Sequence, residues 1–463
     1  MASLPYLIIS PTALLSFIGL LKGADKTVPT PPEDWNKVTV DLIIPAQNEE
    51  NTIVLCLAAI ALQTKKPRQV ILIDDGSKDR TYEYAKEYCA MSGMEVNIIH
   101  RDRGQGKTPS INLLAHESDA DVLFVLDADT ILRSENYIER LVLELYQGVG
   151  IACACGVVLP LMTNDRDRLL KAASLKGFSE KYPSSIAPLH DSWFKKLQQK
   201  IANLYREELY LFLQKFIYRA EMIFFGSIIN PIGCAVAYRR KYLKEVFDRY
   251  EDLLGNDLTT SEDIFIGFSF TDYGYRNVQI QDVYALTQEP PLYKLPPQIF
   301  KWSSAFFQSC YYFSELLATP FKSGAAVMKW YRETTNPEFK EIQKLRKIQE
   351  AYRQAFGFEY TQKYGRPIGW YIFAAALEKV TFPMVIVVMI YFQLWLALMI
   401  TFGLEVLLYS FIIAIAHQNR KVLNFFKSIF LAPIRYLVLF YDIVVFLVFI
   451  RDVIFGKGRS WKK

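Results

Sequence analysis

The chain has 463 residues, of which 51% are hydrophobic and 22% charged, enough for one large catalytic domain and a membrane region. Its formal net charge is only +5 and no concentrated basic stripe occurs, which argues against nucleic-acid binding. Six cysteines without a CxxC pair and four histidines outside any recognisable motif favour buried free thiols and carboxylate chemistry over zinc or disulfides.

The N-terminal residues 4–21 form an uncharged apolar run of 18 residues. A spanning helix needs about 20 such residues, so the run is short, and Pro5 and Pro11 weaken it further. A cleaved signal peptide is the alternative, but a positive n-region and a small-residue cleavage site before Lys22 are both missing. We therefore expect an N-terminal membrane helix within residues 1–27.

A proline-rich linker over 28–35 leads into short apolar runs that alternate with helical patterns. The patterns predict strands over 38–44, 69–74, 95–100 and 121–127, and helices over 49–62, 81–93 and 108–118. Continuous apolar strands that alternate with helices are typical of a parallel sheet covered on both faces. Ligands bind beyond the carboxyl ends of the strands in such sheets.

Two acidic motifs follow two of these strands. Asp74 and Asp75 end the second strand, where a carboxylate can accept a hydrogen bond from the imide N–H of uracil, although a plain turn explains the motif equally well. Asp127 and Asp129 follow the fourth strand, and residues i and i+2 of an extended strand end point the same way. Two such oxygen ligands suit Mg²⁺ or Mn²⁺ on a diphosphate; a polar strand terminus is the alternative.

Two further motifs with polar residues lie in predicted loops. In RDRGQGKTPSIN (101–112), Lys107 and the backbone N–H groups at a helix start can hold phosphate, although the spacing is not that of a P-loop. In TTSEDIFIGF (259–268), Asp263 can face a cleft as the base that removes the proton of an attacking hydroxyl. A helix N-cap is the alternative for Asp263.

The segment PPQIFKW (296–302) places Gln298, Lys301 and Trp302 on one face of a helix. Trp302 offers a flat surface for stacking on a sugar, and the other two side chains can bond to hydroxyls and diphosphate. An amphipathic helix lying on the membrane over about 298–320 is compatible with the same pattern.

The remaining segments are helical in pattern. Residues 165–225 are predicted to be a helical insertion into the catalytic domain, and 321–379 a charged helical or interfacial segment, each with a solvated face. Residues 380–403 are long enough to span a bilayer, and together with 406–416 they could form a hairpin that turns at Gly403. An interfacial helix is predicted over 422–433, and a last apolar run covers 436–450.

Asp442 interrupts the last apolar run, where an ionisable group is costly unless it is paired or faces a cavity. It is predicted either to line a path for the acceptor or to pair with an arginine of another helix, such as Arg435.

Taken in order, the motifs resemble those of the family-2 inverting glycosyltransferases, among them the membrane-bound synthases of the hyaluronan, chitin-oligosaccharide and cellulose type. The PxYNE, DDxS, DxD, [TE/GD]D and QxxRW motifs of that family stand here as Pro45 to Glu49, Asp74 to Ser77, Asp127 to Asp129, Ser261 to Asp263 and Gln298 to Trp302. The resemblance covers roughly residues 38–320. It implies a GT-A type α/β fold, with a Rossmann-like parallel or mixed sheet domain over 28–320, plus an α-helical membrane region over 380–463.

The resemblance also implies a role for individual residues. Asp263 is the expected catalytic base, and Asp127 and Asp129 are the expected ligands of Mg²⁺ or Mn²⁺. The donor would be bound by Pro45, Gln47, Glu49, Asp75, Lys107, Asp127 and Asp129. The acceptor and the diphosphate would be bound by Glu262, Gln298, Lys301, Trp302, Gly233 and Cys234.

Two positions depart from the family pattern. Gln47 replaces the usual aromatic residue, which puts stacking on the base in doubt, and Lys301 replaces the usual arginine, which supplies a point charge in place of a bidentate fork. We expect altered diphosphate binding, with activity retained.

The predicted function is a membrane-bound transferase that takes a sugar from a UDP-sugar and elongates a polysaccharide. The alternative is a lipid glycosyltransferase, resembling ceramide glucosyltransferase, that adds one sugar to a membrane lipid. A non-catalytic scaffold is disfavoured by the complete set of carboxylates. The resemblance places the protein in the cell membrane as a multi-pass protein with its catalytic domain in the cytosol. The sugar, the linkage and the oligomeric state stay open.

Overall fold

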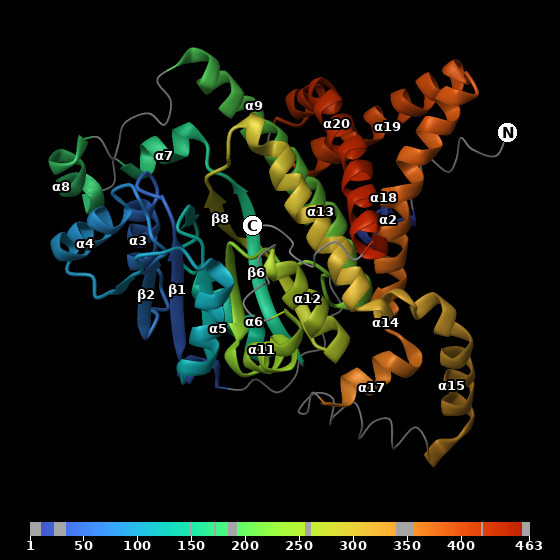
Figure 1. Ribbon diagram of the computed structural model, residues 1–463, viewed down its shortest axis with the longest axis horizontal. Coiled ribbons are helices and arrows are strands. Elements are labelled where there is room, and N and C mark those ends of the chain that lie inside the picture. The colour runs from blue at the N-terminus through green and yellow to red at the C-terminus, as the bar shows by residue number, and fades with distance from the viewer. Residues whose placement is uncertain are drawn as a thin grey trace.

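The computed structural model describes residues 11–22, 34–147, 150–170, 173–183, 192–254, 261–338, 355–417 and 420–455. The expectations for residues 1–10, for most of the linker and for the tail after residue 455 lie outside the described residues. A mixed sheet with its covering helices forms one side of the molecule, and the C-terminal helices form the other (Figure 1).

The first half of the sheet is parallel, as predicted. Its strands are β1 (Val40–Ala46), β2 (Gln69–Asp74), β3 (Asn97–His100) and β4 (Val122–Leu126), in the order β3-β2-β1-β4. The crossover helices are α3 (Ile53–Ala61), α4 (Thr81–Ser92) and α5 (Lys107–Glu117). Leu42, Ile43 and Ile44 of β1 are fully buried, because helices cover both faces of a sheet built by such crossovers. All three predicted helices are confirmed to within a few residues.

The second half makes the sheet mixed and was not predicted strand by strand. It contains β5 (Thr130–Leu132), β6 (Ile151–Pro160), β7 (Ala235–Arg239) and β8 (Arg276–Thr287), and continues the order as β4-β7-β6-β8-β5. β7 is antiparallel to both β4 and β6. Helices α6 (Tyr137–Gln147), α11 (Arg240–Leu254) and α12 (Glu262–Tyr273) pack against this half.

The helical insertion lies between β6 and β7, where the sequence predicts it. It contains α7 (Thr163–Leu170), α8 (Ala173–Lys181), α9 (Trp193–Leu211), a π-helical turn (Phe212–Ile217) and α10 (Tyr218–Phe225). One face of α9 is polar and buried, at Gln199, Asn203 and Arg206. The prediction of a solvated helix is therefore wrong for this face.

Helix α13 (Leu295–Tyr312) runs beside α9 between the sheet and the C-terminal helices (Figure 1). Every residue from Ser303 to Cys310 is buried. The Phe306 ring lies 5.9 Å from that of Phe268 on α12, and the Phe307 ring lies 5.3 Å from that of Phe446. An interfacial helix would leave its apolar face free, so α13 differs from the expected surface helix over 298–320.

The C-terminal helices α18 (Pro367–Tyr391), α19 (Trp395–Ala416) and α20 (Lys421–Phe455) pack with one another. The N-terminal α2 (Pro11–Lys22) packs mainly against α10 and also contacts α18. Between α13 and α18 lie α14 (Ser314–Leu317), α15 (Ser323–Thr335) and α17 (Ala355–Tyr364). Short 3₁₀ turns occur at Trp35–Lys37, Leu292–Lys294 and Thr319–Lys322.

Three predicted boundaries in this region are wrong. Helix α18 begins at Pro367, well before residue 380, because proline suits the first turn of a helix. The hairpin turns at 392–394, where Gln393 adopts φ +57°, while Gly403 lies inside α19. Helix α20 runs through Pro433 without ending there.

Asp442 belongs to an interhelical ion pair, but its partner differs from the predicted one. Lys379 Nζ lies 3.0 Å from Asp442 Oδ2, and Ser303 Oγ donates to Asp442 Oδ1. Arg435 pairs with Glu405 instead, at 2.6 Å. A buried charge is costly when it is unpaired, and each of these charges has an opposite charge on a neighbouring helix.

By length and composition, two helices of the described residues are candidate membrane spans, α18 and α19. Only 22% and 33% of their most apolar windows are buried inside the protein, so both helices leave much of their apolar surface uncovered.

Candidate active site

Residues from four segments meet beyond the carboxyl end of β4. The central group is the ammonium of Lys107, the first residue of α5. Its Nζ lies 2.7 Å from Asp127 Oδ1, 2.9 Å from Glu262 Oε1 and 3.1 Å from the Gly233 carbonyl oxygen. Gly106 adopts φ +98° just before this helix, a conformation that favours glycine. The predicted donor-site lysine is thus brought together with three other predicted site residues.

Asp263 lies in the first turn of α12, next to Glu262. Its Oδ2 accepts from the Gly233 N–H at 3.0 Å and its Oδ1 from its neighbour's N–H, that of Ile264, at 3.0 Å. A Cβ added at Gly233 would lie 2.6 Å from the Asp263 Cβ, so only glycine permits this approach. Asp263 thus satisfies a helix N–H group, as the capping alternative predicts, and binds the Gly233 loop with its other oxygen.

Burial raises the pKa of Asp263 to about 7, and the neighbouring Glu262 carboxylate acts in the same direction, against the ammonium of Lys107. A base works best when its pKa lies near the working pH. The site therefore holds a carboxylate suited to receive a proton near neutrality.

Asp127 and Asp129 lie in a turn between β4 and β5, not on an extended strand end as the sequence suggested, because the Thr130 N–H donates to the Asp127 carbonyl at 2.9 Å. The Asp127 N–H donates to the Cys234 carbonyl at 2.8 Å, and Asp129 Oδ1 accepts from the Thr130 hydroxyl at 3.0 Å. Burial raises the pKa of Asp129 well above its usual value, and the carboxylates of Asp127 and Glu49 raise it further.

This accumulation of acidic oxygens fits a divalent cation, which would offset the mutual repulsion that the raised pKa reports. Among the residues that the structure describes, no three histidine, cysteine or acidic side chains are arranged to hold a metal alone. Asp127 and Asp129 would therefore share the ion with oxygens of the donor and with water.

The carboxylate of Asp75 is engaged by the loop that precedes α5. It accepts from the N–H groups of Gln105 and Gly106, at 2.9 and 2.7 Å, and from the guanidinium of Arg101 at 3.0 Å. The Gln47 amide donates to the Asp75 carbonyl at 2.9 Å. Asp75 thus shapes the loop that leads to Lys107, whatever it contacts in a donor.

Pro45 lies near the end of β1, opposite Ile73 of β2. Glu49, just beyond it, accepts from the Thr52 hydroxyl at 2.9 Å, and burial raises the pKa of Glu49 to about 7. Glu49 lies near the turn that carries Asp127 and Asp129, since its charge acts on both carboxylates.

The segment with Gln298 and Trp302 forms a second cluster around an arginine that sequence reasoning missed. Arg206 of α9 donates through Nη2 to Gln298 Oε1, and its guanidinium carbon lies 4.7 Å from the Trp302 ring centroid. Arg206 Nε lies 3.5 Å from Glu289 Oε2, just past the end of β8. Lys301 is exposed. The sequence signal for this face was the helical spacing of three polar residues, Gln199, Asn203 and Arg206, all of which are buried in the structure.

The two clusters adjoin each other through the end of β8. The Gln288 N–H donates to the Asp129 carbonyl at 3.0 Å, and the Glu289 carboxylate contributes to the raised pKa of Asp129. The structure therefore brings together Lys107, Asp127, Asp129, Glu262, Asp263, Gly233 and Cys234, with Gln298 and Trp302 beside them. Asp75 is held apart by the loop that precedes α5.

Comparisons with known proteins show what this chain is similar to. Residues 41–247 match the family model described as Glycosyl transferase family 2. An N-acetylglucosaminyltransferase of Bradyrhizobium diazoefficiens is 25% identical over 59% of this chain and 50% of its own length. A human dolichyl-phosphate beta-glucosyltransferase is 30% identical over 23% of this chain and 36% of its own. The matched part of this chain spans no more than half the length of either relative.

Among solved structures, a mannosyltransferase from Pyrobaculum calidifontis in complex with GDP-Man and Mn²⁺ has a TM-score of 0.42 at 14% identity, over 79% of this chain and 94% of that one. This similarity is too low to transfer any property of that enzyme. The mixed α/β sheet and the family match confirm the predicted GT-A type fold. Residues 41–247, somewhat less than half of this chain, are thus similar to glycosyl transferase family 2.

Proposed function

We propose that the protein is a membrane-associated inverting glycosyltransferase that takes a sugar from a UDP-sugar, with Mg²⁺ or Mn²⁺ as cofactor. The observation that carries the proposal is the convergence of Asp127, Glu262 and Gly233 on the Lys107 ammonium, with Asp263 bonded to the same Gly233. The acids expected to act on the leaving group and on the acceptor thus share one site.

The reaction needs one base and one way to stabilise a leaving diphosphate. Asp263 takes the proton of the acceptor hydroxyl while the oxygen of that hydroxyl forms a bond to the anomeric carbon. The bond from that carbon to the donor phosphate oxygen breaks, and its electron pair leaves with the nucleoside diphosphate. Asp127 and Asp129 would hold the divalent ion, which when bound would supply positive charge for that leaving group.

Lys107 connects the two halves of this chemistry. Its ammonium neutralises the Asp127 and Glu262 carboxylates in the site as it stands. Because its three contacts use its three N–H donors, reaching a donor phosphate requires it to exchange one of them. Lys107 would then neutralise part of the negative charge of the leaving diphosphate.

The first candidate for the product is a polysaccharide, built by repeated transfer to a growing chain. One of the longer matches is to a protein named N-acetylglucosaminyltransferase, which supports transfer of an N-acetylglucosamine unit.

A second candidate is transfer of one sugar to a membrane lipid. Its specific support is that only α18 and α19, among the described residues, qualify as candidate spans, too few to enclose a path for a polar chain across a bilayer. The human relative, which is named for a lipid phosphate, points the same way.

Incubation of the full-length protein in lipid nanodiscs with a panel of radiolabelled UDP-sugars and Mn²⁺ tests the proposal. We expect transfer that stops on addition of EDTA and resumes with excess Mn²⁺. A high-molecular-weight product supports the first candidate, and a lipid-soluble product with one sugar supports the second. If no donor gave either sugar transfer or sugar release, that result would contradict the proposed function.

A further inference from the structure

Arg206 is among the largest side chains that are almost fully buried, with 2% of its surface exposed. It comes from the helical insertion, not from the family 2 sheet strands, and lies beside two residues of the predicted acceptor motif. Burial of a guanidinium is costly and is tolerated where its N–H groups are engaged.

Three neighbours from two segments engage this guanidinium. Gln298 accepts from Nη2, the Trp302 ring lies 4.7 Å away, and Glu289 lies 3.5 Å from Nε. A planar fork can make these contacts together, whereas the single ammonium of a lysine cannot. The guanidinium therefore fixes α13 relative to the end of β8, which also carries the backbone contact to Asp129.

One donor of the fork is left over. Arg206 Nη1 is buried and has no hydrogen-bond partner among the described residues. Buried donors without partners are rare in proteins because each costs free energy. A tie that served packing alone would gain nothing from this unsatisfied group, which points to a role of the cluster in the function of the neighbouring Gln298 and Trp302.

We propose that Arg206 is a positioning residue for glycosyl transfer, which holds Trp302 and Gln298 in the orientation that receives the acceptor. This inference rests on the proposed function and adds to it the insertion as a source of the acceptor site. The competing explanation is a purely structural tie between α9 and α13.

The test compares Arg206→Lys and Arg206→Met with Lys200→Met, which removes an exposed cation from the same helix. N-acetylglucosamine oligosaccharides and a total lipid extract serve as acceptor probes. Affinity for UDP and release of sugar to water from the labelled donor are measured alongside transfer, together with the thermal unfolding midpoint.

We expect Arg206→Met to lower kcat/KM for the acceptor about 10- to 100-fold, mostly through KM, because charged hydrogen bonds contribute in that range. UDP affinity and sugar release to water should stay within about twofold of the starting protein. Arg206→Lys should fall between the two, since it keeps the charge beside Glu289 and loses the fork. Lys200→Met should match the starting protein.

Equal acceptor KM in all variants would overturn the inference while leaving the proposed function standing. Loss of UDP affinity in both Arg206 variants would also overturn it, because the arginine would then serve the fold. A starting protein that neither transfers nor releases sugar would instead contradict the proposed function.

Discussion

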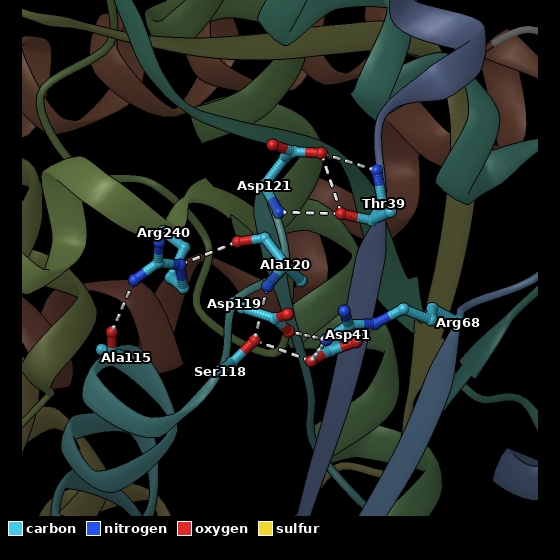
Figure 2. A network of polar contacts seen from close by, with 9 residues as sticks. All are labelled: Thr39, Asp41, Arg68, Ala115, Ser118, Asp119, Ala120, Asp121 and Arg240. Carbon is cyan, nitrogen blue, oxygen red and sulfur yellow. Dashed lines mark hydrogen bonds and ion pairs between the residues drawn. The ribbon is translucent and has the colours of Figure 1, made fainter.

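The two ends of the parallel strands carry polar clusters of different character. At the amino end, Asp41 of β1, Arg68 and Ser118 form a network in which partners satisfy every carboxylate, as Figure 2 shows. Asp121, before β4, accepts from the N–H and hydroxyl of Thr39 at 2.9 and 2.8 Å.

At the carboxyl end, acids face other acids. The pKa values of Glu49, Asp127, Asp129 and Asp263 are all raised, with burial as the largest cause. A fold gains nothing from crowding carboxylates in this way, so the contrast indicates that the amino end serves stability and the carboxyl end serves ligand binding.

The largest effect is expected when one acid at each end of the parallel strands is replaced. Asp263→Asn should lower the rate of transfer by about 1,000-fold, because an amide cannot take the proton of the acceptor. Asp121→Asn is its matched control at the amino end and should leave the rate within about twofold. Equal rates for Asp263→Asn and the starting protein would remove the assignment of the base.

A glycine pair sharpens the same comparison. Gly233→Ala would place a methyl group 2.6 Å from the Asp263 Cβ, so α12 or the loop must move. We expect about a 100-fold loss of transfer, since displaced catalytic groups cost this much. Gly324→Ala, where no atom lies within 4 Å, should be neutral. Unchanged transfer by Gly233→Ala would show that the contact is dispensable.

The pH dependence of the rate should follow the acid at the carboxyl end. Because the pKa of Asp263 is raised to about 7, its active, deprotonated form falls about tenfold for each pH unit below that value. A pH–rate profile of kcat/KM between pH 5 and pH 9 should rise to a plateau.

The same shift has the opposite effect on stability. The folded protein binds the Asp263 proton more tightly than the unfolded chain, so this group stabilises the fold below its ordinary pKa, and that contribution is lost as the pH rises through about 7. In the pH–rate profile, a value of kcat/KM that stays constant down to pH 5 would contradict the assignment of Asp263 as the base.

The smallest effect on activity is expected at the amino end. Arg68→Met leaves the buried Asp41 without its ion pair and should lower the free energy of unfolding by about 2 kcal/mol, with kcat unchanged where the protein is folded. Arg80→Met, which removes an exposed pair with Glu83, is the control and should have little effect on the unfolding midpoint. Loss of kcat in folded Arg68→Met would mean that the two ends are coupled.

Local patterns were sufficient to predict the first half of the sheet. The runs at 69–74 and 121–127 became β2 and β4 because continuous apolar strands must be buried on both faces. The acids were found because they directly follow such strands. The turn that holds Asp127 and Asp129 was missed, since it depends on a backbone bond from Thr130.

Features that depend on contacts across the chain were not predictable in this way. Arg206 is separated by 92 positions from Gln298, and the sequence of α9 does not specify that contact. β7 pairs with β4 across more than 100 residues, and its own pattern does not specify an antiparallel neighbour. Pairing was one of the two alternatives for Asp442 and is the one that the structure shows, but the choice of Lys379 over Arg435 depends on helix packing.

The position of α13 has a practical consequence for dissecting the protein. Its aromatic residues fill the space between α12 on one side and Phe446 and Phe449 of α20 on the other. Cutting the chain before α18 would strip one wall from that aromatic layer and expose Phe307 to water. Sugar transfer should therefore be studied with the whole polypeptide in detergent or lipid, because a shortened, water-soluble catalytic fragment would aggregate along this seam.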